Sequence, residues 1–123
     1  MNVQEILMRF ALIANLNLEE AAPWISICSE AEQELRALLK DASLEQANSM
    51  RLNAAAAALA FYRYTLYRAS GSGMNDFSVG DIKVVEDKKT SVELAKRIWE
   101  ESKLTVLDII VDNEFLVGQV KII

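Results

Sequence analysis

The chain has 123 residues, a length that suits one domain with a single hydrophobic core. Its net charge of −5 at pH 7 argues against a nucleic-acid-binding surface, because such surfaces usually carry a marked basic patch. No uninterrupted apolar stretch approaches about 20 residues, so no transmembrane helix is expected. A lone cysteine, Cys28, and the lack of a visible signal peptide favour a reducing, cytoplasmic environment.

The first third of the chain predicts two helices. Apolar residues recur between Val3 and Ala14 with the spacing of an amphipathic helix, which we expect over about residues 2–15. A second helix is expected over about residues 18–41, preceded by a capping box of Asn17 and Glu20. Its first part is expected as a turn near Leu18 to Ala22, and the long helix proper begins at about Pro23. Its core-facing stripe is expected to comprise Trp24, Ile27, Cys28, Ala31, Leu35, Leu38 and Leu39.

The middle of the chain predicts a long, alanine-rich helix over about residues 44–70. Residues 54–58 are five consecutive alanines, and bulky aromatic residues follow them from Phe61 onward. Small side chains let the backbones of neighbouring helices approach closely, which suits a tightly packed bundle. The glycines of residues 70–73 end this helix.

The last third of the chain predicts both strand and helix. Apolar residues alternate around Ile82 and Val84, which indicates a strand over about residues 79–86. A fourth helix is expected over about residues 91–111, followed by a β-prone segment at 115–122. The expected fold is one mainly α domain: a bundle of about four helices with a small β-strand or hairpin arm and an apolar C-terminal tail.

Catalytic chemistry finds little support in the sequence. The chain has no histidine, so the commonest general base and metal ligand is absent. Cys28 lies on the apolar stripe of the second expected helix, which favours an inert core thiol over a nucleophile. We therefore expect no catalytic residue, no cofactor and no metal site, and we do not expect an enzyme.

A tyrosine–arginine cluster is the best candidate for an interaction site. Tyr64 and Arg68 are four residues apart on a helix, where a cation–π contact can form, and Tyr67 lies between them. Tyrosine and arginine are enriched at interface hot spots. A place in the protein's own core explains the tyrosines equally well, so both interpretations stay open.

The apolar C-terminal segment is the second candidate. Phe115, Leu116 and Val117 need a partner to bury them. This segment either pairs with the predicted strand of its own chain, which we favour slightly, or adds to the sheet edge of a neighbouring subunit. Ile82 and Val84 belong to the same expected interface.

The order of these motifs resembles head–tail connector proteins of tailed bacteriophages and prophages, also called head-completion or DNA-packaging adaptors. The resemblance lies in the leading helical pair with Leu18-Glu-Glu-Ala-Ala-Pro-Trp24 and in the alanine-rich helix with its motif from Arg51 to Tyr64. It continues in Phe77-Ser-Val-Gly-Asp-Ile-Lys-Val84 and in the final helix with its apolar end.

The resemblance implies a structural subunit that forms a homo-oligomeric ring at the portal and extends the DNA channel. Its partners would be copies of itself, the portal and tail-side virion proteins, with DNA passing through without sequence-specific binding. It would occur in the bacterial host cytoplasm during assembly and then in the virion, with no membrane partner. The alternative is a cytoplasmic helical regulator that binds one protein partner as a small dimer.

Overall fold

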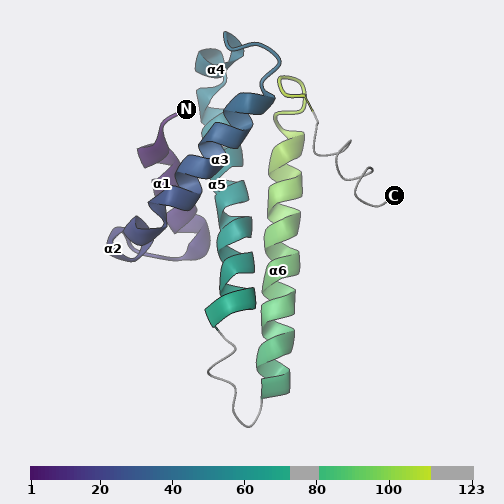
Figure 1. Ribbon diagram of the computed structural model, residues 1–123. Coiled ribbons are helices and arrows are strands. Elements are labelled where there is room, and N and C mark those ends of the chain that lie inside the picture. The colour runs from purple at the N-terminus through teal and green to yellow at the C-terminus, as the bar shows by residue number, and fades with distance from the viewer. Residues whose placement is uncertain (73–80, 112–123) are drawn as a thin grey trace.

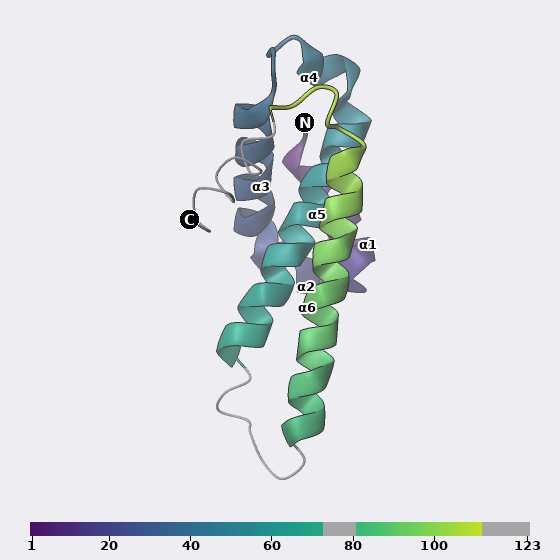
Figure 2. The same cartoon turned by 90° about the vertical axis from the view of Figure 1, so that its right-hand side faces the viewer.

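Helix α5 (Ser49–Tyr67) is the central element, packed against α1 (Val3–Ala14), α3 (Ile25–Leu38) and α6 (Asp81–Leu104) (Figure 1). The computed structural model describes residues 1–72 and 81–111. The chain runs in one direction along α1 and α5 and in the opposite direction along α3 and α6 (Figures 1 and 2). The prediction of a mainly helical bundle is therefore confirmed.

The alanines of α5 occupy the centre of this bundle. Ala55, Ala56, Ala57 and Ala60 are fully buried, and Ala58 nearly so. A helix that is buried on most of its sides needs neighbours all round, and α5 has three. Small side chains at these positions allow all three neighbours to pack against one helix, as the sequence predicted.

The helices expected over residues 18–41 and 44–70 are both interrupted. The helix over residues 18–41 is divided into α2 (Leu18–Ala21), a 3₁₀ turn η1 (Ala22–Trp24) and α3. Pro23 explains the interruption, because it has no backbone N–H to donate within a helix. The predicted capping box is confirmed: Glu20 N–H donates to Asn17 Oδ1 at 2.8 Å, and Asn17 N–H donates to the Glu20 carboxylate at 2.9 Å.

The expected helix over residues 44–70 begins as a short α4 (Leu44–Ala47), which a turn at Asn48 separates from α5. It ends in a π-helical turn η2 (Arg68–Ser72).

The predicted strand over residues 79–86 is wrong. Helix α6 begins at Asp81, so Ile82 and Val84 lie on a helix, and α6 ends at Leu104 rather than near residue 111. A short apolar run fits the two-residue repeat of a strand as well as the repeat of about 3.6 residues of a helix. Val85, Val92 and Trp99 are spaced seven residues apart, which is a helical repeat. The expected β arm is thus absent from the described residues, and the predicted strand at 115–122 lies outside them.

After α6, the chain crosses to the end of α3. Ile110 forms an antiparallel β-bridge with Leu39. Lys40 N–H donates to the Ile109 carbonyl at 3.0 Å, and Val111 N–H donates to the Leu38 carbonyl at 2.7 Å. Val106 and Ile110 are buried in the core, so this crossing closes the top of the bundle in Figure 2.

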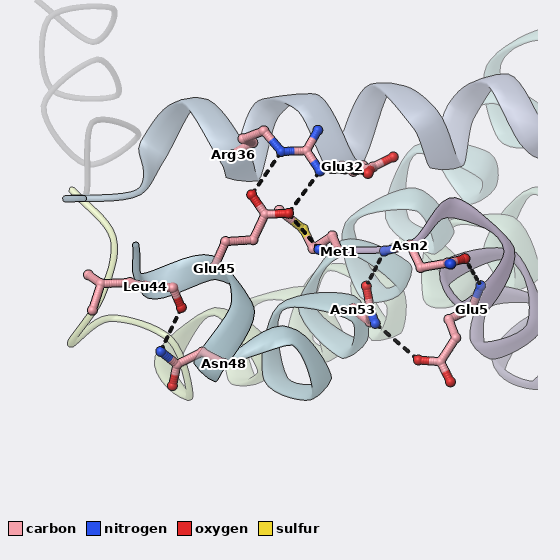
Figure 3. A network of polar contacts seen from close by, with 9 residues as sticks. All are labelled: Met1, Asn2, Glu5, Glu32, Arg36, Leu44, Glu45, Asn48 and Asn53. Carbon is pink, nitrogen blue, oxygen red and sulfur yellow. Dashed lines mark hydrogen bonds and ion pairs between the residues drawn. The ribbon is translucent and has the colours of Figure 1, made fainter. Parts of the chain in front are cut away.

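A chain of ion pairs joins the N-terminus to α3 and α4 (Figure 3). The α-amino group of Met1 lies 2.5 Å from the Glu45 carboxylate, which also accepts from Arg36 Nε at 2.9 Å. Arg36 in turn pairs with Glu32 at 2.8 Å. Hydrogen bonds from Arg36 and then from the α-amino group lower the pKa of Glu45 from 4.5 to about 2.

Asn53 on α5 anchors the start of α1 (Figure 3). Its side chain is only 3% exposed. Its Oδ1 accepts from Asn2 N–H at 3.0 Å, and its Nδ2 donates to the Glu5 carboxylate at 3.0 Å. Asn2 also caps α1, since its Oδ1 accepts from the N–H groups of Gln4 and Glu5. This buried amide therefore fixes where α1 sits on α5.

Candidate interaction site

A groove opens where the start of α3 lies against the end of α5. Its volume is about 550 Å³. Pro23 and Trp24 enter it from η1, and Tyr67 closes it from the last turn of α5. The full lining is mostly apolar and aromatic: Pro23, Trp24, Ser26, Ile27, Glu30, Arg63 and Tyr67.

A cluster of aromatic side chains packs against Trp24, next to this groove. Tyr64 is 6% exposed, and its ring meets Trp24 edge-to-face with the ring centroids 4.7 Å apart. Phe10 of α1 meets the same ring at 5.2 Å, again edge-to-face. Such pairs contribute about 0.5–1.5 kcal/mol beyond the burial of their area. The cluster therefore holds the Trp24 indole in a defined position at the groove wall.

Tyr67 provides the accessible aromatic surface. Its side chain is 63% exposed, and its ring meets Trp24 at 5.7 Å with an interplanar angle of 77°. The two rings thus form a corner that is open to solvent. An exposed aromatic corner beside Pro23 and Ile27 suits the burial of an apolar side chain from another segment.

The predicted contact between Arg68 and Tyr64 is confirmed. The guanidinium carbon of Arg68 lies 5.6 Å from the Tyr64 ring centroid, and Nη1 donates to the Tyr64 hydroxyl at 2.8 Å. This bond satisfies the polar end of a buried tyrosine. Arg68 lies in η2, where α5 changes from α-helical to π-helical hydrogen bonding. Arg68 therefore helps to hold the Tyr64 ring in the aromatic cluster at the end of α5.

The polar rim of the groove carries both signs of charge. Arg63 forms a two-pronged ion pair with Glu34, and its Nη2 lies 2.8 Å from the carboxylate. Both side chains are partly exposed, so the pair contributes little to the free energy of folding, about 0–1 kcal/mol. Its effect is to hold the guanidinium at the groove edge, with Glu30 lining the same groove.

The structure divides the predicted interface residues into three groups. Tyr64 lies in the core, while Tyr67 is exposed at the groove and Arg68 is exposed at the end of α5. Ile82 and Val84 lie on α6 instead of on a strand. Phe115, Leu116 and Val117 lie outside the described residues.

Sequence reasoning missed Trp24, Pro23 and Ile27 as groove residues. Trp24 and Ile27 were expected on the core-facing stripe of the helix that begins near Pro23. The proline indicated where that helix begins, but it did not show that the residues beside it would line a groove. Trp24 stays half-buried, with one side on Tyr64 and the other at the groove.

Cys28 is an inert core thiol, as predicted. It is fully buried, and burial raises its pKa from 9.0 to about 11, so the reactive thiolate is scarce at neutral pH. Within residues 1–72 and 81–111, no group of three potential ligands could hold a metal ion. No helix in that part of the chain combines the length and the apolarity needed to cross a membrane.

No protein-family model, curated protein or solved structure matches this chain. The described residues form a helical bundle with an open aromatic groove between the start of α3 and the end of α5. The resemblance to head–tail connectors stays a prediction that depends on the sequence motifs alone.

Proposed function

We propose that the chain is a structural adaptor of a phage or prophage virion, which assembles into a ring at the portal and connects head and tail. The open groove formed by Trp24, Ile27 and Tyr67 carries this proposal. An exposed tyrosine and a half-buried tryptophan beside a partly polar rim are typical of protein–protein interfaces, where both residue types are enriched. The proposal assigns no catalytic activity, cofactor or metal to the chain.

A ring requires two different contact surfaces on each subunit, because its interfaces are heterologous. The groove is one candidate surface. A second is the outer stripe of α1, where Met8 and Leu12 lie four residues apart and Leu12 is 81% exposed. The exposed Met8 and Leu12 on α1 and the groove between α3 and α5 give the subunit the two different surfaces that ring closure needs.

The remaining parts of the proposal follow from the role of a connector. The ring extends the DNA channel, and DNA passes through it without sequence-specific binding, which suits a chain of net charge −5. Portal and tail-side virion proteins are the other partners. Assembly takes place in the bacterial host cytoplasm, and the ring is then part of the virion.

Size-exclusion chromatography with light scattering, over a concentration series, tests this function. We expect closed rings, visible by negative staining, and we expect Tyr67→Ser to shift assembly to higher concentration. Leu66→Ser is the matched control, because Leu66 is the exposed neighbour of Tyr67 on α5 and does not line the groove. Equal effects of the two substitutions would remove the groove from the assembly surface.

The second candidate function is a regulator that binds one protein partner as a small dimer. The same groove favours it, since one groove per chain can receive one segment of a partner. A dimer that persists at every concentration, with no larger species, would support the regulator and contradict the ring.

A further inference from the structure

We infer that residues 115–117 of the chain's own C-terminal segment bind in the Trp24–Tyr67 groove. The inference starts from the direction in which the chain leaves the described structure. Residues 38–40 continue upward from the end of α3, and the bridge between Leu39 and Ile110 is antiparallel. The chain at Val111 therefore runs antiparallel to residues 38–40, back toward the start of α3, where the groove lies.

The length of chain after Val111 matches the distance to the groove. The N–H of Val111 donates to the carbonyl of Leu38. Ile27, which lines the groove, lies eleven residues before Leu38 on α3. At 1.5 Å per residue, this part of α3 is about 17 Å long. An extended chain advances about 3.3 Å per residue, so about five residues cover that distance. Residue 116 is thus the one expected at Ile27.

The chemistry of the segment fits the same register. Asp112, Asn113 and Glu114 are polar, and they would run beside the exposed, polar side of α3. Phe115, Leu116 and Val117 are the first apolar residues after them, and they reach the groove where its apolar lining begins. Binding there would cover Tyr67 and the open side of Trp24, which the described residues leave accessible.

The consequence for assembly depends on the proposed function. If the groove is a subunit contact, residues 115–117 occupy that contact in the isolated chain, and a neighbouring subunit must displace them. Tethering favours the chain's own segment at low protein concentration, because its effective concentration at the groove is high. Assembly then requires a higher protein concentration than it would if the groove were empty in the isolated chain.

Disulfide trapping in the full chain tests the inference directly. Ser26 lines the groove, so Ser26→Cys combined with Leu116→Cys is expected to form an intramolecular disulfide under mild oxidation of dilute protein. Glu93→Cys combined with Leu116→Cys is the control pair, since Glu93 is exposed on α6. The native Cys28 does not interfere, because it is fully buried.

Each result of this trapping experiment has a definite meaning. A monomeric, internally linked product that forms faster than in the control pair supports the inference. Disulfide-linked dimers in its place would show that the segment binds the groove of a neighbouring copy and would overturn it. Equal rates in the two pairs would also overturn it, yet would leave the ring test of the proposed function unaffected.

Tryptophan fluorescence supplies a second readout that needs no cross-link. Leu116→Asp places a charge at the residue expected in the groove, so acrylamide quenching of Trp24 should increase and its emission should shift to the red. Trp99 is buried in the core and adds a constant background. Gln119→Asp adds the same charge three residues later and should leave both properties unchanged. Identical spectra for the two variants would contradict the inference.

Discussion

At the scale of single residues, Asn53 is the buried polar group on which the position of α1 depends. Asn53→Ala removes the acceptor of Asn2 N–H and the donor to Glu5, so we expect a loss of about 1–3 kcal/mol in the free energy of unfolding. Urea denaturation measures this loss. Gln46→Ala, on the exposed side of α4, is the control and should change stability by less than about 0.5 kcal/mol.

Glu45 makes stability depend on pH in a predictable direction. Its pKa in the folded protein is about 2, lower than the unfolded value near 4.5, so the folded state prefers the charged carboxylate. The contribution is therefore complete above pH 4.5 and is lost as the pH falls toward 2. Glu45→Gln should lower stability at pH 7 and make the loss between pH 5 and pH 2 less steep.

Thermal melting over this pH range tests the role of Glu45. Arg36→Gln is the informative companion, because the hydrogen bond from Arg36 is the largest cause of the lowered pKa. It should flatten the same part of the pH profile, and the double variant should add little to either single change. The side chain of Glu45 is 22% exposed, so high salt should weaken all of these effects. Parallel profiles for parent and variants would contradict this account.

At the scale of helices and strands, the sequence pattern predicted the contacts between residues that are close in sequence. It did not predict the structure of segments that residues far away in the sequence can stabilise. The capping box of Asn17 and Glu20 and the contact between Tyr64 and Arg68 are both local, and both were predicted. The helical start of α6 was not, because Ile82 and Val84 are β-branched residues whose spacing fits a strand as well. Helix α6 as a whole packs along α5, and no local pattern reveals that contact.

Proline substitution tests whether residue 87 lies inside α6. The predicted strand over residues 79–86 and the predicted helix from residue 91 leave residue 87 in a connection between them, where proline would be tolerated. In a helix interior, Asp87→Pro removes a backbone hydrogen bond and should cost about 3 kcal/mol. Far-UV circular dichroism and thermal melting measure the loss. Asp87→Ala should preserve or increase helicity, and an Asp87→Pro variant as stable as the parent would contradict the helix.

At the scale of the whole molecule, the groove shows why a site is harder to predict than an element. Its residues come from η1, α3 and α5, and they meet only because α3 packs against α5. Tyr67 could be proposed from the sequence, since it lies in a local cluster with Arg68. Trp24 could not, because its contact with Tyr64 joins residues 40 positions apart.

The packing of the whole bundle also rests on the small size of the α5 side chains. Ala57 is fully buried in a helix that α1, α3 and α6 all contact, so a larger side chain there must push a neighbour away. Ala57→Leu should lower the free energy of unfolding by about 1–3 kcal/mol through overpacking. Urea denaturation of Ala57→Leu measures this cost.

Ala54→Leu is the matched control for this prediction. It makes the same change on the same helix, but Ala54 is only partly buried, so the added side chain can extend toward solvent. We expect it to keep nearly the parent stability and the parent helicity. Leucine has a helix propensity close to that of alanine, so a difference between the two variants must come from packing. If Ala57→Leu were as stable as Ala54→Leu, the close approach of three helices to α5 would be wrong.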